Sequence, residues 1–306
     1  MKIAFFAPQI DVRGTSVATY DYAHFNETIL KHESIIIHNR VDPRNITSAV
    51  ERFKSRFYVD SIEIENISNE YYKENGQKIR NDLDEILQRE NCDAMYVLKG
   101  GGDDGLYSDK FPTFVHCTGY QNVPHGTVYA YVSNHVNNTV ANGKFPVVPH
   151  MINIPEHNEN LRSELEIPID FTVFGRSGGI DTWNLPFASH VVEVTLQHRK
   201  DVVFLFQNTP KFIRHPRVFF LESNPSVHFK TKFINTCDAL LHARMEGESF
   251  GLTCGEFSIR NKPVITWLGS PEKNHIEVLG SKGMYYMTPD DLFNILMKFK
   301  LDKSLD

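Results

Sequence analysis

Two glutamates with seven residues between them frame the start of a predicted helix: Glu248 lies in the loop before it, and Glu256 lies about two turns along it. The apolar run at 239–241 predicts a buried strand, a polar loop covers 244–249, and a helix is expected from about Phe250-Gly251 to Arg260. The first N–H groups of such a helix are unpaired and carry a partial positive charge, so this end of a βαβ unit suits a phosphate. The spacing therefore predicts an anion site framed by two carboxylates.

Each glutamate alone has a simpler explanation. Glu248 near the first turn is a favourable charge for the helix dipole, and Glu256 two turns later is a solvated face residue. For a lone glutamate these interpretations would be preferred. The two together, with Phe-Gly-Leu between them and Lys262-Pro263-Val264 behind them, favour a functional site.

The wider motif carries a family resemblance. Glu248-Ser249-Phe250-Gly251-Leu252, then Glu256, then Asn261-Lys262-Pro263-Val264 resembles the signature of retaining GT-B glycosyltransferases of the family 4 type. The resemblance implies a sugar-nucleotide donor held at Ser249, Phe250, Gly251 and Leu252. It also implies that Glu248 holds the donor sugar, that Glu256 binds the ribose hydroxyls, and that neither a metal nor a separate cofactor is required.

Arg176 is the predicted ligand of the donor diphosphate. It stands in the glycine-rich segment 175–179, after a predicted strand at 171–174. Its guanidinium fork matches phosphate geometry. The alternative is a surface charge. The phosphate interpretation is preferred because an arginine in such a loop rarely serves packing. By the resemblance it stabilises the leaving group, together with helix N-termini. The lysine that usually follows is missing, because 180–184 read Ile-Asp-Thr-Trp-Asn.

The first half of the chain contributes weaker signals. His116 lies at the carboxyl end of a predicted strand at 113–117, where α/β folds place their chemistry, and Phe114 to Thr118 resembles the family strand that presents an active-site histidine to the donor sugar. His125, in Pro-His-Gly, is a turn residue and the second candidate. Gly14 and Thr15 lie where the loop after the first strand meets a predicted helix. One interpretation is a turn glycine and an N-cap hydroxyl. The other, which the resemblance favours, is a second set of N–H groups that contact the sugar-nucleotide donor.

Alternating strands and helices predict an α/β protein with the GT-B fold, two doubly wound Rossmann-like domains facing across a cleft. A proline-bracketed strand within 145–152, followed by the polar stretch 155–160, marks the domain exit. We therefore expect an acceptor-side domain at 1–155 and a donor domain at 156–306. In some arrangements of this fold, the last helix of the chain crosses back to the N-terminal domain. In the second domain, short helices are expected at 161–166 and 232–236, with loops across 207–228.

Composition limits the remaining possibilities. A net charge of −6 over 306 residues gives no general attraction to nucleic acid, and no apolar stretch approaches the length of a membrane span. The four cysteines form no Cys-x-x-Cys pair, so reduced thiols in a cytoplasmic protein are expected. Asp103 and Asp104, in a glycine-rich loop, lack the further ligands that a metal needs.

These observations predict a retaining, metal-independent glycosyltransferase that moves a sugar from a nucleotide-sugar to a glycan or another hydroxyl acceptor. Two alternatives stay open. One is a sugar-nucleotide epimerase or hydrolase on the same fold. The other is a catalytically silent sugar-nucleotide-binding partner of a second transferase, which the missing lysine supports.

Overall fold

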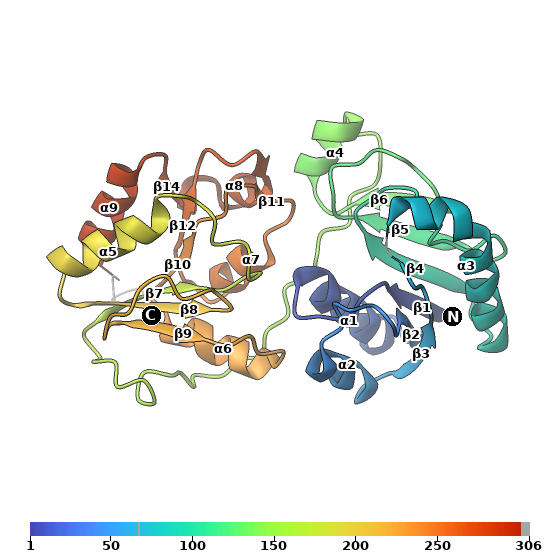
Figure 1. Cartoon of the computed structure of the whole chain (residues 1–306), viewed down its shortest axis with the longest axis horizontal. Coiled ribbons are helices and arrows are strands. Elements are labelled where there is room, and N and C mark those ends of the chain that lie inside the picture. Colours follow the sequence, from blue (N-terminus) through green and yellow to red (C-terminus); the bar gives the residue numbers. More distant parts are fainter. Residues whose placement is uncertain (67, 301–306) are drawn as a thin grey trace. The chain divides into compact units, whose positions relative to one another are not determined.

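The computed structural model describes residues 1–66 and 68–300, and the chain divides into two compact α/β units (Figure 1). The first unit is Met1–Met151 and the second is Ile152–Asp306, of which 301–306 lie outside the described residues. The sequence placed this division at 155. The proline-bracketed strand expected within 145–152 is wrong, because only an isolated bridge from Val147 to Tyr131 forms there.

The first unit is built on a six-stranded parallel sheet in the order β3-β2-β1-β4-β5-β6. Its strands carry short, nearly continuous apolar runs, as expected for a parallel sheet covered on both faces. The strands are β1 (Lys2–Ala7), β2 (Glu33–Asn39), β3 (Tyr58–Ile62), β4 (Ala94–Lys99), β5 (Thr113–Cys117) and β6 (Val128–Tyr131). The helices are α1 (Gly14–Thr28), α2 (Thr47–Lys54), α3 (Asn69–Arg89) and α4 (Asn134–Ala141).

The second unit repeats this architecture with the sheet order β14-β12-β10-β7-β8-β9. The main strands are β7 (Thr172–Arg176), β8 (Val202–Gln207), β9 (Val218–Leu221), β10 (Ala239–His242), β12 (Val264–Trp267) and β14 (Met284–Tyr286). Two short strands, β11 (Gly247–Glu248) and β13 (Glu272–Lys273), pair separately. The helices are α5 (Ala188–His198), α6 (Val227–Thr236), α7 (Leu252–Ser258), α8 (Asn274–Leu279), the 3₁₀ turn Gly280–Lys282, and α9 (Pro289–Lys298).

The core of the second unit lies on both faces of its sheet. Alternate residues of β8 face opposite ways, so Phe204 and Phe206 join one apolar cluster while Val203 and Leu205 join the other. The first cluster includes Leu292 of α9, which packs beside α5 within this unit (Figure 1). The helix expected at 161–166 is wrong, because that segment forms only turns.

Parallel strands place the loops after β7, β8, β10 and β12 at one edge of the second sheet, which is where α/β folds bind ligands. The cysteines are free and buried. None of the helices among residues 1–66 and 68–300 is both long enough and apolar enough to cross a bilayer.

Candidate active site

Glu248 is positioned by the short strand pair β11–β13, in which Gly247 lies opposite Glu272 and Glu248 opposite Lys273. Gly247 has a φ of 81°, and a Cβ there would come within 2.0 Å of the Glu272 carbonyl oxygen. Only glycine allows so close a pairing at this backbone angle. The carboxylate is therefore fixed by a strand, and not by the loose loop that the sequence suggested.

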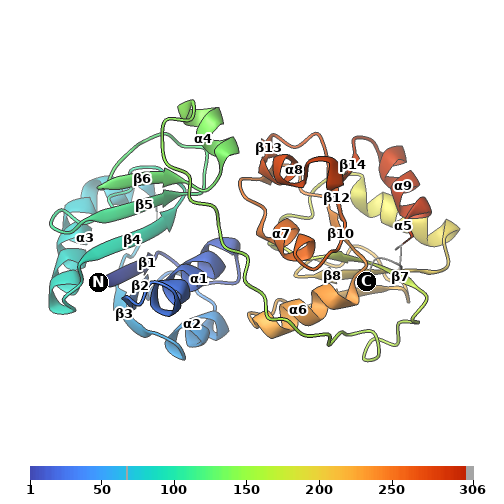
Figure 2. The same cartoon turned by 180° about the vertical axis from the view of Figure 1, so that it is seen from behind.

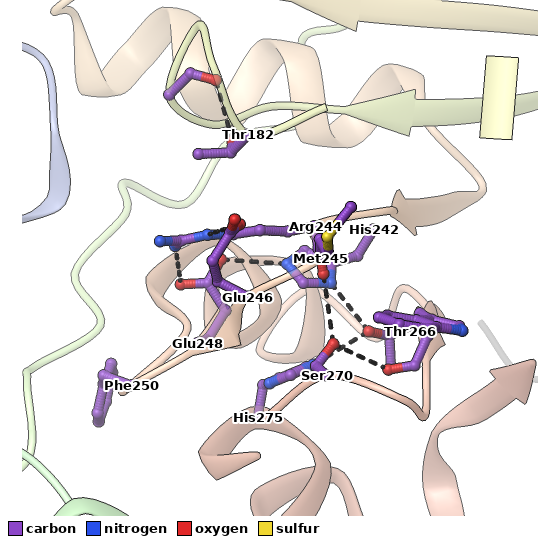
Figure 3. A network of polar contacts seen from close by, with 12 residues as sticks. Thr182, His242, Arg244, Met245, Glu246, Glu248, Phe250, Thr266, Ser270 and His275 are labelled. Atoms are coloured by element: carbon purple, nitrogen blue, oxygen red, sulfur yellow. Dashed lines mark hydrogen bonds and ion pairs between the residues drawn. The ribbon is translucent and has the colours of Figure 1, made fainter. Parts of the chain in front are cut away.

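The Glu248 carboxylate is held by two basic side chains (Figure 3). Its Oε1 lies 3.1 Å from Nε2 of His242, and its Oε2 accepts a hydrogen bond of 3.1 Å from Nη1 of Arg244. Burial alone would raise the pKa of Glu248, but the hydrogen bond with His242 and the charges of His242 and Arg244 outweigh it and lower this pKa to about 2. Glu248 is therefore ionised across the physiological pH range.

Behind His242 the polar contacts continue into the core of the sheet (Figure 3). Nδ1 of His242 lies 2.9 Å from Oγ1 of Thr266, which in turn lies 3.1 Å from Nε2 of His275. His242 and Thr266 are paired residues at the ends of β10 and β12, so the strand register sets this contact. Because His242, Thr266 and His275 are buried, they form a rigid support for Glu248.

Arg176 is the last residue of β7, with only 3% of its surface exposed, so the surface-charge alternative is wrong. Its Nη1 donates to the Gln207 and Asn208 carbonyls at 3.1 and 2.9 Å and to Oγ1 of Thr209 at 2.6 Å. Its Nη2 donates to the Gly179 carbonyl at 2.7 Å and to Oγ1 of Thr182 at 2.6 Å. The guanidinium thus ties the loop after β7 to the loop after β8.

This arrangement corrects the expectation that an arginine here rarely serves packing. The terminal nitrogens of Arg176 are committed to protein acceptors, so direct binding of a diphosphate by this residue stays a prediction. Burial lowers the pKa of Arg176 to about 10, while the nearby charge of Glu248 opposes this effect and that of Arg244 adds to it. Arg176, Arg244 and Glu248 are therefore close enough for their charges to interact.

Glu256 is buried within α7 and forms an ion pair of 2.6 Å with Nζ of Lys230 on α6. The alternative of a solvated face residue is therefore wrong for Glu256. Burial raises the pKa of the Cys254 thiol, and the charges of Glu248 and Glu256 raise it further. Cys254 therefore lies near both glutamates of the motif. The structure thus gathers the two carboxylates around one short helix.

The residues between the two glutamates form the entry to α7. The helix begins at Leu252, one or two residues later than expected, and ends at Ser258. Gly251 precedes it with a φ of 93°, a conformation that favours glycine. The Phe250 carbonyl accepts a hydrogen bond of 2.8 Å from Nδ2 of Asn274, which fixes the turn. Binding of a donor at Ser249, Phe250, Gly251 and Leu252 stays a prediction.

The first unit holds the remaining predicted residues. His116 lies near the carboxyl end of β5, one residue before Cys117, with 2% of its surface exposed, and its Nδ1 is hydrogen-bonded to the Tyr96 hydroxyl. Its ring also packs against Tyr22 and His150. Burial lowers the pKa of His116 to about 4, so the ring is neutral at pH 7. A neutral imidazole has one nitrogen that donates and one that accepts a hydrogen bond, and the catalytic role of His116 stays a prediction.

Gly14 and Thr15 open α1, but neither caps it in the expected way. Arg13 is the N-cap residue, and Asp11 with Ser16 ties the preceding loop through Oδ1 and Oγ at 2.9 Å. The N-cap interpretation of Thr15 is therefore wrong, and donor contacts from this turn stay a prediction. His125 lies in a loop, where its Nδ1 is 2.6 Å from the Val123 carbonyl oxygen.

The sequence did not single out His242, Arg244, Thr266, His275 or Lys230 as site residues. Arg244 and His242 could have been found from the motif, since they stand four and six residues before Glu248 on the same strand-to-loop segment. Lys230 could not, because it comes from a separate helix. Arg244 keeps one buried nitrogen, Nε, without a hydrogen bond among the described residues, although Glu246 lies 3.8 Å away as an ion-pair partner.

Comparison with solved structures identifies the architecture. A glycosyltransferase from Rickettsia africae ESF-5 superposes with a TM-score of 0.69 at 16% identity, covering 96% of this chain and 86% of the other. The Anabaena protein HepE, in complex with UDP and glucose, superposes with a TM-score of 0.70 at 12% identity, covering 100% and 91%. The chain has the GT-B fold. At these identities the likeness establishes the fold alone.

A solved structure that is named for a different activity also matches. A putative UDP-N-acetylglucosamine 2-epimerase from Listeria monocytogenes superposes with a TM-score of 0.65 at 12% identity, covering 97% of this chain and 88% of the other. No protein-family model matches the sequence, and a search of curated proteins finds no match.

Proposed function

We propose that this protein is a retaining, metal-independent glycosyltransferase of the family 4 type, which transfers a sugar from a nucleotide-sugar to a hydroxyl acceptor. The observation that carries the proposal is the Glu248 carboxylate, held between Arg244 and His242 at the entry to α7 and kept ionised by them. The GT-B fold supports it, as does the motif from Glu248 to Val264. UDP-sugars are the first donors to test, because the HepE structures contain UDP-glucose or UDP with glucose.

In this proposal Glu248 binds hydroxyl groups of the donor sugar. Two basic partners restrict its side chain, so little conformational entropy is lost when the sugar binds. Glu256 takes the ribose hydroxyls from a fixed position, since Lys230 holds the other side of its carboxylate.

Glycosyl transfer passes through an oxocarbenium-like state while negative charge grows on the departing diphosphate. Preorganised cations and N–H groups at that position lower the barrier. We propose Arg244 for this task in place of the missing lysine, because one of its nitrogens pairs with Glu248 and its buried Nε has no hydrogen bond among the described residues. Arg176 then acts mainly by holding the two neighbouring loops in place.

The test begins with a thermal-shift screen of the purified chain against UDP-, GDP-, ADP- and dTDP-sugars. A donor at about 100 times its Kd stabilises the folded state by roughly 2.7 kcal/mol, which is readily measured. Glu248→Gln should weaken the shift and lower turnover by about 100-fold or more. Glu222→Gln is the matched control, because this glutamate is exposed and lies outside the Glu248 group. No shift with any donor, or equal behaviour of the two variants, would overturn the assignment.

A chelator tests metal independence. We expect turnover to be unchanged after treatment with EDTA, because the proposed chemistry uses only Arg244, backbone N–H groups and the carboxylates. Loss of turnover with recovery on adding Mg²⁺ or Mn²⁺ would contradict this part of the proposal.

A second candidate is a sugar-nucleotide epimerase, which the Listeria neighbour favours. The two functions differ in their products. A transferase releases free nucleoside diphosphate in proportion to the acceptor consumed, whereas an epimerase yields a new nucleotide-sugar without any acceptor. Tight donor binding with no product of either kind would instead indicate a catalytically silent binding partner.

A further inference from the structure

A second group of polar side chains lies where the chain enters the second unit, on residues that the proposed transfer does not use. The segment that follows Met151 runs along α6 (Figure 2), and its backbone is held there by side chains. Nδ2 of Asn235 donates to the carbonyls of His157 and Glu159 at 2.6 and 2.9 Å, and Nη2 of Arg260 donates to the His157 carbonyl at 2.6 Å. The backbone at 157–159 is therefore fixed.

Three side chains converge on this fixed backbone. The imidazole rings of His157 and His228 are stacked, with centroids 4.1 Å apart and an interplanar angle of 23°. Nε2 of His228 lies 3.0 Å from Oε1 of Glu159. One nitrogen or oxygen atom from each of the three residues lies within 4.8 Å of the others.

The donor set selects one class of ion. Two imidazoles and one carboxylate suit Zn²⁺ and similar transition metals, whereas Mg²⁺ and Ca²⁺ prefer oxygen ligands alone. Zinc–ligand bonds of about 2.0–2.2 Å place tetrahedral ligand atoms roughly 3.4 Å apart, so the group must close by about 1.4 Å at most. His228 and Glu159 can move that far by side-chain rotation, since their side chains are 54% and 58% exposed.

The present contacts leave coordinating atoms available. Nε2 of His157 makes only a contact of 3.3 Å with the His228 carbonyl, and its buried Nδ1 has no hydrogen bond among the described residues. Glu159 forms no ion pair with a lysine or arginine in the part of the chain that the structure describes. The main contact that a cation would have to break is the one of 3.0 Å between Nε2 of His228 and Oε1 of Glu159.

We propose that His157, Glu159 and His228 bind one Zn²⁺-class ion, with water completing the coordination, and so fasten the segment after Met151 to α6. The ion would be structural, because none of its ligands belongs to the Glu248 group. The proposal is independent of the transferase assignment, and its test requires no sugar nucleotide.

The test measures Zn²⁺ binding to metal-free protein by competition with a chromophoric chelator. We expect one ion per chain and an increase of Tm with Zn²⁺. His228→Ala should weaken binding by about 100-fold or more, and Glu159→Gln by about 10-fold. His190→Ala is the control, because it removes an exposed histidine of α5 and should bind Zn²⁺ like the unaltered protein.

Circular dichroism of each variant separates loss of the site from loss of the fold. A His157→Ala and His228→Ala double variant that still binds one Zn²⁺ with unchanged affinity would place the ion elsewhere and overturn the proposal. So would an unaltered protein that binds Zn²⁺ no more tightly than His228→Ala.

Discussion

Replacing Arg176 by methionine separates a structural role from direct phosphate binding. Methionine approximates the length and apolar stem of arginine but removes the charge and the five hydrogen bonds that link the loops after β7 and β8. The Gly179 carbonyl also accepts from Oγ1 of Thr182, and the Gln207 carbonyl accepts from Oγ1 of Thr209. The Asn208 carbonyl, which accepts from Nη1 of Arg176, is therefore the acceptor that the substitution affects most.

The expected magnitude follows from these contacts. The pKa of Arg176 falls from 12.5 to about 10, and this net effect of burial and the nearby charges opposes the charged form by roughly 3 kcal/mol, a cost that disappears with methionine. Removing one partner of a buried charged network typically costs about 3–5 kcal/mol, but here the groups left behind are neutral. We therefore expect the free energy of unfolding to fall by about 2–4 kcal/mol.

The assay is urea unfolding and thermal melting of Arg176→Met beside Arg244→Met. A loss of about 2–4 kcal/mol corresponds to a decrease of roughly 5–15 °C in the Tm of a unit of this size. Arg244→Met should change Tm less, because Arg244 makes one hydrogen bond to Glu248 and is partly exposed. If Arg176→Met melts within about 1 °C of the unaltered protein yet loses donor binding, Arg176 is a phosphate ligand and the structural argument is refuted.

Two further predictions concern the carboxylates. The pKa of Glu248 is lowered from 4.5 to about 2, so its ionisation stabilises the fold above pH 4.5, and this stabilisation of at most roughly 3 kcal/mol is lost as the pH falls toward 2. In urea unfolding, the free energy of unfolding should therefore decline less steeply over this pH range in Glu248→Gln than in the unaltered protein. Equal slopes would contradict the assigned contacts. Lys230→Met should lower the free energy of unfolding by about 2–4 kcal/mol, because it leaves Glu256 buried without its cation. Adding Glu256→Gln should recover part of this loss. The absence of recovery in this double-mutant cycle would show that the pair is not coupled.

Most of the strands could be predicted from the sequence because parallel strands buried on both faces are short apolar runs. The prediction for β5, Thr113–Cys117, has the bounds found in the structure, whereas β7, expected at 171–174, begins one residue later and extends through Gly175 and Arg176 at its end. That extension changed the interpretation of Arg176. Arg176 was expected in a loop, but it is the last residue of β7, where its side chain donates hydrogen bonds to protein acceptors.

The helix α6 shows why part of the site was missed. A short helix was expected at 232–236, with loops before it, but α6 begins at Val227 with Ser226 as its N-cap. His228 was thus assigned to a loop and Lys230 to no element, and their contacts with Glu159 and Glu256 could not be foreseen. Contacts between separate elements depend on the three-dimensional packing, which hydrophobic periodicity does not encode.

The strand order of the second unit has a consequence for how the two halves of the site form during synthesis. The first strand made, β7, lies inside the sheet, and β8 and β9 add to one side of it in sequence order. The tie between Arg176 and Thr209 therefore closes over a short stretch of chain and is available early on the ribosome. Glu248 and its partners require β10 and β12, which lie on the other side of β7 and are synthesised later, so this part of the site cannot close until the chain has been made beyond β12.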